Sequence, residues 1–181
     1  MDDIELHGAL IGQQGSRGAL NTPVLVLDLD ILDRNIAAMA ALAKAHGVSL
    51  RPHAKTHKSV DIAERQLAAG AVGLCCAKIG EAEVLADGGI TGLLITSPVT
   101  APAAIARLAS LAGRSAGLIA TIDSPDVARR IAAALAEAGT SLDVMIDIDP
   151  GIRRTGVASP EAAVELAPGE EHILTQTVRI R

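Results

Sequence analysis

The feature that most constrains the fold is an alternation of two hydrophobic periods along most of the chain. Short runs rich in β-branched residues and leucine alternate with longer, alanine-rich amphipathic stretches. This alternation is typical of parallel strands joined by helical crossovers, so the sequence predicts an α/β fold. The predicted strands are residues 24–28, 48–53, 72–76, 92–95, 117–122 and 143–148.

Helix signals fall between these runs. Asp30 or Asp33 can begin a helix over residues 35–45, with Gly47 after its end, and Pro102 suits a first helical turn. Residues 124–126 begin a helix that ends at Gly139, and residues 161–167 start like another crossover helix. The strands recur about every 24 residues, which suits the βα unit of a (β/α)8 barrel.

The chain has 181 residues, whereas eight βα units typically fill about 250. Five or six strands cannot close an eight-stranded barrel, and an unclosed barrel leaves an apolar strand edge uncovered. We therefore expect an incomplete barrel, whose remaining strands lie in further sequence or in a partner. The expected organisation is an extended, glycine-rich arm over residues 1–22, a partial barrel over 23–167 and a divergent tail over 168–181.

Composition excludes several classes of protein. The net charge of -5 comes from 21 acidic and 16 basic residues spread along the sequence, so no basic stripe is available for nucleic acid. The sequence has neither a secretory signal nor an apolar run of transmembrane length, which predicts a cytoplasmic protein that does not bind membranes. Cys75 and Cys76 point to opposite faces of a predicted strand, so we expect two reduced thiols.

The densest polar cluster is Arg-Pro-His-Ala-Lys-Thr-His-Lys, residues 51–58, at the end of a predicted buried strand. With the strand's period of two, Arg51, His53 and Lys55 share one face. The carboxyl end of a barrel strand is where that fold has its active site, and a lysine crowded by other cations there is suited to attack an aldehyde. A solvated loop whose basic side chains face water accounts for the spacing equally well.

Four separated segments, this cluster among them, resemble the D-threonine aldolase and D-serine dehydratase family. They are residues 21–30 with Asn35 and Ile36, then 51–58, 73–83 and 149–157, in the order in which the family has them. The likeness covers about residues 5–167. It implies a barrel of the alanine racemase N-terminal type (fold type III) that binds pyridoxal 5'-phosphate (PLP), with the segment around residues 23–28 pairing outside the barrel.

The resemblance also implies roles for single residues. Lys55 would bind PLP covalently, and Arg154 would contact the phenolic oxygen of the pyridine ring. We expect His53 to face the cofactor, as a base or as a ring-stacking partner, and His57 to be a loop residue. The full-length family enzymes are expected to form homodimers and to hold a divalent metal, whose ligands are absent from this chain.

Three other side chains are weaker candidates. Lys78 follows a predicted strand and is a minor candidate for an active-site position. Asp147 and Asp149 flank Ile148 on one strand face and can be interpreted as metal ligands. We favour the alternative that they order the turn at Pro150, which presents Arg154.

The resemblance therefore implies a PLP-dependent lyase whose small-molecule substrate is a β-hydroxy D-amino acid. We expect D-threonine aldolase chemistry, the cleavage of D-threonine to glycine and acetaldehyde. Residues 11–17 and 75–78 favour it over the alternative, D-serine dehydration. Two further alternatives are a non-enzymatic PLP-binding barrel and a truncated, inactive form of the enzyme.

Overall fold

The computed structural model describes residues 3–167, and the chain divides after Asn35 into two compact units. The predicted tail over residues 168–181 lies outside the described residues. The predicted boundaries of the arm and the barrel stay a prediction.

The first unit, up to Asn35, contains helices where the sequence predicts an extended arm. Helix α1 spans Asp3–Leu10, and a 3-10 turn, η1, spans Ser16–Ala19. The His7 ring accepts a hydrogen bond at Nε2 from the Asn21 backbone N–H, with an N–N distance of 3.1 Å, and so links α1 to the residues after η1. For residues 3–22, the prediction of an extended arm is therefore wrong.

Residues 24–28 have no regular secondary structure, although the sequence predicts a strand there. Within the part of the chain that the structure describes, no ladder of backbone hydrogen bonds joins them to another segment, and a strand requires such a ladder. Leu25 is fully exposed. Helix α2, Leu29–Ala45, follows directly because the Asp28 carboxylate accepts the Ile31 N–H at 3.0 Å and caps it. The predicted start at Asp30 or Asp33 is wrong.

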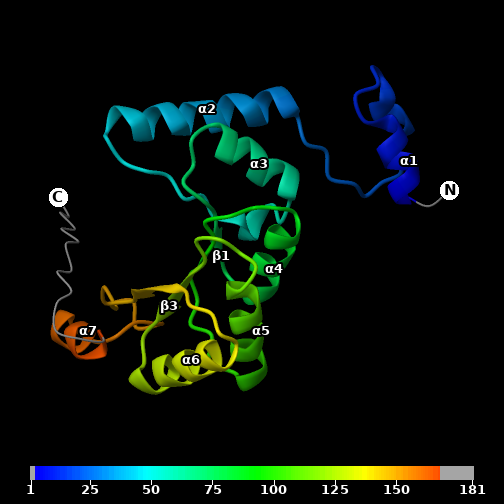
Figure 1. Ribbon diagram of the computed structural model, residues 1–181. Coiled ribbons are helices and arrows are strands. Elements are labelled where there is room, and N and C mark those ends of the chain that lie inside the picture. The colour runs from blue at the N-terminus through cyan, green and yellow to red at the C-terminus, as the bar shows by residue number, and fades with distance from the viewer. Residues whose placement is uncertain (1–2, 168–181) are drawn as a thin grey trace. The chain divides into compact units, whose positions relative to one another are not determined.

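The second unit, from Ile36 onwards, contains a parallel sheet with helices between its strands (Figure 1). In residues 36–167 the strands are β1 Cys75–Cys76, β2 Leu94–Ile95, β3 Ile119–Ile122 and β4 Asp143–Ile146, in the spatial order β1-β2-β3-β4. The helices are α3 Val60–Ala68, α4 Ile79–Asp87, α5 Pro102–Ala112, α6 Pro125–Glu137 and α7 Pro160–Leu166. Consecutive strands are neighbours, which confirms the predicted α/β class with helical crossovers.

The helices of the second unit cover one face of its sheet. Helix α3 contacts α4, α4 contacts α5 and α5 contacts α6, and Figure 1 shows α4, α5 and α6 along the strands. Of two adjacent rows of paired residues, Cys76, Ile95 and Ala120 are fully buried, whereas Cys75, Leu94 and Ile119 are half-buried. The remaining large side chains that are fully buried are Leu74, Leu85, Leu93, Leu108 and Leu111.

Strands β1, β2 and β3 begin later than predicted, and a glycine with positive φ lies just before each of them. Gly73 has a φ of 146° and Gly92 a φ of 66°, values that L-residues in strands do not adopt. The Arg51 guanidinium donates through Nη1 to the Gly92 carbonyl, so it lies against both glycines. Backbone and guanidinium therefore meet closely at the amino ends of β1 and β2.

The predicted strand over residues 48–53 is reduced to a single bridge. His53 pairs in parallel with Cys75, while Leu50 and Pro52 accept hydrogen bonds from Val72 and Cys75 at 2.8 and 2.7 Å. Pro52 has no N–H, so it cannot donate to a ladder. The segment still lies beside β1, on the side away from β2.

The other helix signals agree with the structure. Gly47 follows α2 with a φ of 63°, Pro102 is the first residue of α5 and Ser124 is the N-cap position of α6. None of the helices within residues 3–167 is long and apolar enough to cross a bilayer.

We predict that Gly73→Ala destabilises the fold more than Gly70→Ala. Both glycines have positive φ, at 146° and 102°, so both alanines are strained. A methyl group at Gly73 would also overlap the Gly92 carbonyl and the Arg51 guanidinium, whereas Gly70 faces open space. We expect Gly73→Ala to lower the free energy of unfolding by about 1–3 kcal/mol more than its control does. Urea unfolding curves of the two variants measure this difference. Equal costs would contradict the close approach.

Candidate functional site

Polar side chains gather where the parallel strands end. The carboxyl ends of neighbouring parallel strands lie along one edge of a sheet, and in barrels this edge carries the active site. The residues that follow the strand ends at this edge are His53 and Lys55, then Lys78, Thr96, Asp123, Asp147 and Asp149. We call this set the carboxyl edge.

Lys55 lies in a 3-10 turn, η2, that spans Ala54–Thr56. Ala54 is buried and anchors the turn, whereas Lys55 is exposed. Because the turn begins at Ala54, the strand's period of two no longer determines the direction of the Lys55 side chain. In residues 3–167, no ion pair involves the Lys55 ammonium group.

His53 is the N-cap of this turn and makes two hydrogen bonds through its ring. Nδ1 accepts from the Lys55 backbone N–H at 3.4 Å, and Nε2 lies 3.3 Å from the Thr96 hydroxyl oxygen. Burial, and after it the neighbouring Lys55 charge, hold the pKa of His53 below its ordinary value. The ring is therefore neutral at pH 7. The hydrogen bond to the Lys55 N–H brings together His53 and Lys55, two residues of the predicted site.

Arg51 does not join them. Its guanidinium donates to the Gly92 carbonyl, before β2 begins, and so lies toward the amino ends of the strands. The prediction that Arg51 shares one face with His53 and Lys55 therefore does not bring its guanidinium to the carboxyl edge.

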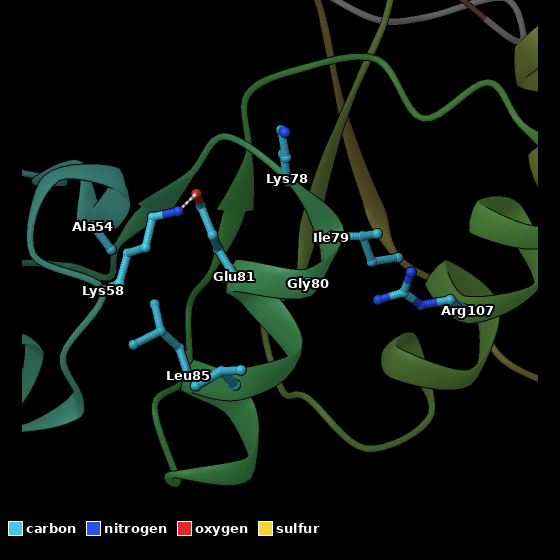
Figure 2. Close-up of a pocket in the computed structure, with 9 residues that line it drawn as sticks. Ala54, Lys58, Lys78, Ile79, Gly80, Glu81, Leu85 and Arg107 are labelled. Carbon is cyan, nitrogen blue, oxygen red and sulfur yellow. Dashed lines mark ion pairs between the residues drawn. The ribbon is translucent and has the colours of Figure 1, made fainter.

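Lys58 is engaged by a carboxylate. Its Nζ lies 3.2 Å from Glu81 Oε1 (Figure 2). The second oxygen of Glu81 accepts the Ala77 N–H at 2.8 Å. Burial alone would raise the pKa of Glu81, but the Ala77 N–H and the Lys58 ammonium outweigh it and hold that pKa below its usual range. The pair borders a cavity of about 510 Å³, which Lys78, Arg107 and the first turn of α4 also line.

Arg154 lies in the loop that follows β4, and Asp149 holds this loop in shape. The Asp149 carboxylate accepts the N–H groups of Gly151 at 2.9 Å and Arg153 at 3.0 Å. These bonds, that from Arg153 first, lower the pKa of Asp149. The prediction that Asp149 orders the turn before Arg154 is confirmed.

The Arg154 side chain itself is exposed. Within the described residues, no contact links it to His53 or Lys55. Along the sheet order, its loop and the His53 segment lie at opposite ends, with all of β1 to β4 between them. The structure brings together the first two predicted site residues and leaves the third apart.

Two residues of the carboxyl edge were missed by sequence reasoning. Thr96 contacts His53, and Asp123 accepts the Gly156 N–H at 3.2 Å, which joins the end of β3 to the Arg154 loop. Both directly follow the last residue of a strand, and this position is the signal that could have identified them.

The two cysteines, Cys75 and Cys76, are neighbours at β1. Both are free thiols, as predicted, with Cys76 buried and Cys75 half-buried, and burial raises the pKa of Cys76 to about 12. Among residues 3–167, no three His, Cys, Asp or Glu side chains lie close enough together to hold a metal ion.

Comparison with known proteins identifies the family. The sequence profile described as "Alanine racemase, N-terminal domain" matches residues 27–174, which is most of the chain. This chain belongs to that family. The crystal structure of D-threonine aldolase from Filomicrobium marinum superimposes on this alanine racemase N-terminal domain with a TM-score of 0.80 and 43% identity, over 83% of this chain and 40% of that one. The expected fold, a partial barrel of the alanine racemase N-terminal type, is confirmed.

Two curated relatives of the chain are named as an aldolase and a dehydratase of 3-hydroxyaspartate. A 3-hydroxy-D-aspartate aldolase of Paracoccus denitrificans is 45% identical over 149 residues, 82% of this chain and 38% of its own length. A D-threo-3-hydroxyaspartate dehydratase of Delftia sp. is 40% identical over 150 residues, 83% of this chain and 39% of its own length. The chain thus spans about two fifths of the proteins that it matches.

We predict that the two half-buried histidines, His53 and His57, make the fold less stable in mild acid. Burial lowers the pKa of both His53 and His57 from 6.5, so the unfolded chain takes up protons first as the pH falls. Their contribution to stability is fully present above pH 6.5 and is lost as the pH falls through the lower folded pKa values. Between pH 7.5 and 5.5, the urea midpoint should fall more in the natural chain than in a double His53→Gln, His57→Gln variant.

His46→Gln is the matched control, because the His46 side chain is exposed. It should keep the full decrease of the midpoint. A double variant that behaves like this control would contradict the burial of neutral rings.

Proposed function

We propose that this chain carries the cofactor lysine of a PLP-dependent lyase that acts on β-hydroxy D-amino acids, and that Lys55 is this lysine. The observation that carries the proposal is the state of the neighbouring amines. Lys55 is exposed in a turn at the carboxyl edge without an ion pair in residues 3–167, whereas Lys58 is paired with Glu81. A covalent bond to PLP needs a primary amine that is not held by a carboxylate.

The donor groups of the carboxyl edge fit PLP. The cofactor offers an aldehyde for an amine, a ring for stacking and a phenolic oxygen for a cation. Lys55 supplies the amine and the ring of His53 lies beside the same turn. Arg154, in the loop after β4, supplies a guanidinium from the other end of the sheet order. We propose Lys55, His53 and Arg154 as the residues that hold the cofactor.

When bound, PLP supplies an electron sink for the electrons of the bond that breaks at the substrate's α-carbon. The chain's own residues would bind and orient it. Lys55 would carry it, and Arg154 would stabilise the ionised phenolic oxygen through a charge-assisted hydrogen bond. Both His53 nitrogens are engaged, so His53 would contribute its ring face and not a free base.

Aldol cleavage is the favoured reaction, with D-threonine as the favoured substrate. The names of the Filomicrobium and Paracoccus relatives support aldol cleavage of a β-hydroxy D-amino acid. The Delftia relative supports the second candidate, dehydration, of which D-serine dehydration is one form. For the whole protein, we also propose a divalent metal, a homodimeric assembly and a cytoplasmic location.

We predict that borohydride reduction of the chain with added PLP fixes the cofactor on Lys55. Peptide mass mapping reads the labelled residue directly. Lys55→Ala should abolish specific labelling, and Lys58→Ala should leave it intact because Lys58 is engaged by Glu81. A label chiefly on Lys58 or Lys78 would mean that the cofactor lysine has been misassigned. In the same samples, Arg154→Leu should shift the absorbance of the bound cofactor, and Arg154→Lys should not restore it.

The reaction itself is tested in a chimera. Residues 27–167 of this chain replace the matching part of the Filomicrobium D-threonine aldolase, with which the chain shares 43% identity. We expect cleavage of D-threonine to glycine and acetaldehyde, and a loss of more than about a thousandfold with Lys55→Ala. The matched control is Lys44→Ala, an exposed lysine of α2.

The products separate the candidate functions. Pyruvate from D-serine, without acetaldehyde from D-threonine, would favour dehydration. PLP bound on Lys55 with neither product would favour a binding barrel without catalysis.

A further inference from the structure

We propose that Thr96 is a positioning residue, which fixes His53 as the tautomer protonated at Nε2 and thereby holds the turn that carries Lys55. Thr96 directly follows β2, and its side chain contacts His53 across β1. The inference gives Thr96 a role in the proposed function and rests on it only for the importance of Lys55.

The hydrogen bond from Lys55 determines one nitrogen of the ring. The Lys55 backbone N–H can only donate, so His53 Nδ1, at 3.4 Å, must accept and carries no proton. A neutral imidazole has one proton, and this proton therefore lies on Nε2. Nε2 then donates to the Thr96 oxygen 3.3 Å away.

The other end of the chain of bonds gives the same assignment. The Thr96 hydroxyl lies 3.1 Å from the Cys76 carbonyl, which can only accept, so the hydroxyl proton is used there. The Thr96 oxygen is left to accept from His53. The three hydrogen bonds thus all donate in one direction. The Lys55 N–H donates to His53 Nδ1, His53 Nε2 donates to the Thr96 oxygen, and the Thr96 hydroxyl donates to the Cys76 carbonyl.

This chain of bonds acts on the Lys55 turn. The Lys55 N–H belongs to the first residues of η2, whose amides have no partner within the turn, and His53 Nδ1 satisfies it. If Thr96 could not accept, His53 would lose one of the two hydrogen bonds that keep its proton on Nε2, and only the Lys55 N–H would still favour that tautomer. With the proton on Nδ1, the ring could no longer accept from Lys55, and the turn would lose its cap.

His57 is an internal comparison within the same segment. Its Nδ1 accepts the Ser59 N–H at 3.1 Å, in the same geometry, but the side chain that faces its ring is Gln66 and not Thr96. Thr96 should therefore affect the tautomer of His53 and leave that of His57 unchanged.

The experiment is nitrogen NMR of the full 181-residue chain with labelled histidine, without PLP, together with hydrogen exchange of the Lys55 amide. In the natural chain, His53 should show a protonated Nε2 and an unprotonated Nδ1. Thr96→Val should shift both resonances toward the other tautomer and speed Lys55 amide exchange by about five- to tenfold, the loss of one hydrogen bond. Thr96→Ser should restore both, and Thr100→Val, at an exposed threonine of the same loop, should change neither.

Two outcomes would overturn the inference. A protonated Nδ1 on His53 in the natural chain would do so even if Thr96→Val does not fold. An unchanged tautomer in a folded Thr96→Val, judged by an unchanged His57 signal, would also do so. Since neither readout uses PLP, failure of PLP labelling at Lys55 with the expected tautomer would remove the proposed function alone.

Discussion

Parallel pairing of consecutive strands is the constraint on which the rest of the second unit depends. It brings the ends of segments far apart in sequence to one edge, so His53 meets Thr96 across 43 residues and Asp123 meets Gly156 across 33. The pairing needs close approach of the backbones at the other end. There, a side chain at Gly73 would overlap the Arg51 guanidinium and the Gly92 carbonyl, and one at Gly92 would lie 2.8 Å from the Val72 carbonyl oxygen. The polar edge and the glycine-lined end are thus two consequences of one arrangement.

Charge pairing distinguishes the lysines of the motif more sharply than sequence position does. Glu81 is largely buried, and a buried carboxylate needs a partner because isolated burial of the charge is costly. Lys58, with a φ of 48°, comes from a turn conformation that aims it at this carboxylate. The ion pair therefore stabilises a buried carboxylate, and within residues 51–58 Lys55 is the lysine without an ion pair.

The α/β class, the helices after Pro102 and Ser124 and the family follow from the sequence, because hydrophobic period and short motifs are local signals. Strand ends do not follow in the same way. Pro52 and Gly92 shorten their strands through a missing donor and a positive φ, whereas the hydrophobic pattern continues through both. Residues 24–28 have a strand-like composition without a partner in the described chain. Thr96 was missed because its role depends on an imidazole 43 residues away, which no spacing rule encodes.

The basic motif is better understood as two histidine caps around a lysine. His53 and His57 each accept, through Nδ1, the backbone N–H two residues further on. Both rings thus accept a hydrogen bond from the backbone, and burial keeps both rings neutral by lowering their pKa. A ring that accepts at Nδ1 and donates at Nε2 has no lone pair left to remove a proton. In the proposed lyase, the base at the substrate's β-hydroxyl must therefore be a group other than His53. The histidine next to the cofactor lysine would then govern where the amine lies, and its ring face would be what it offers to a cofactor.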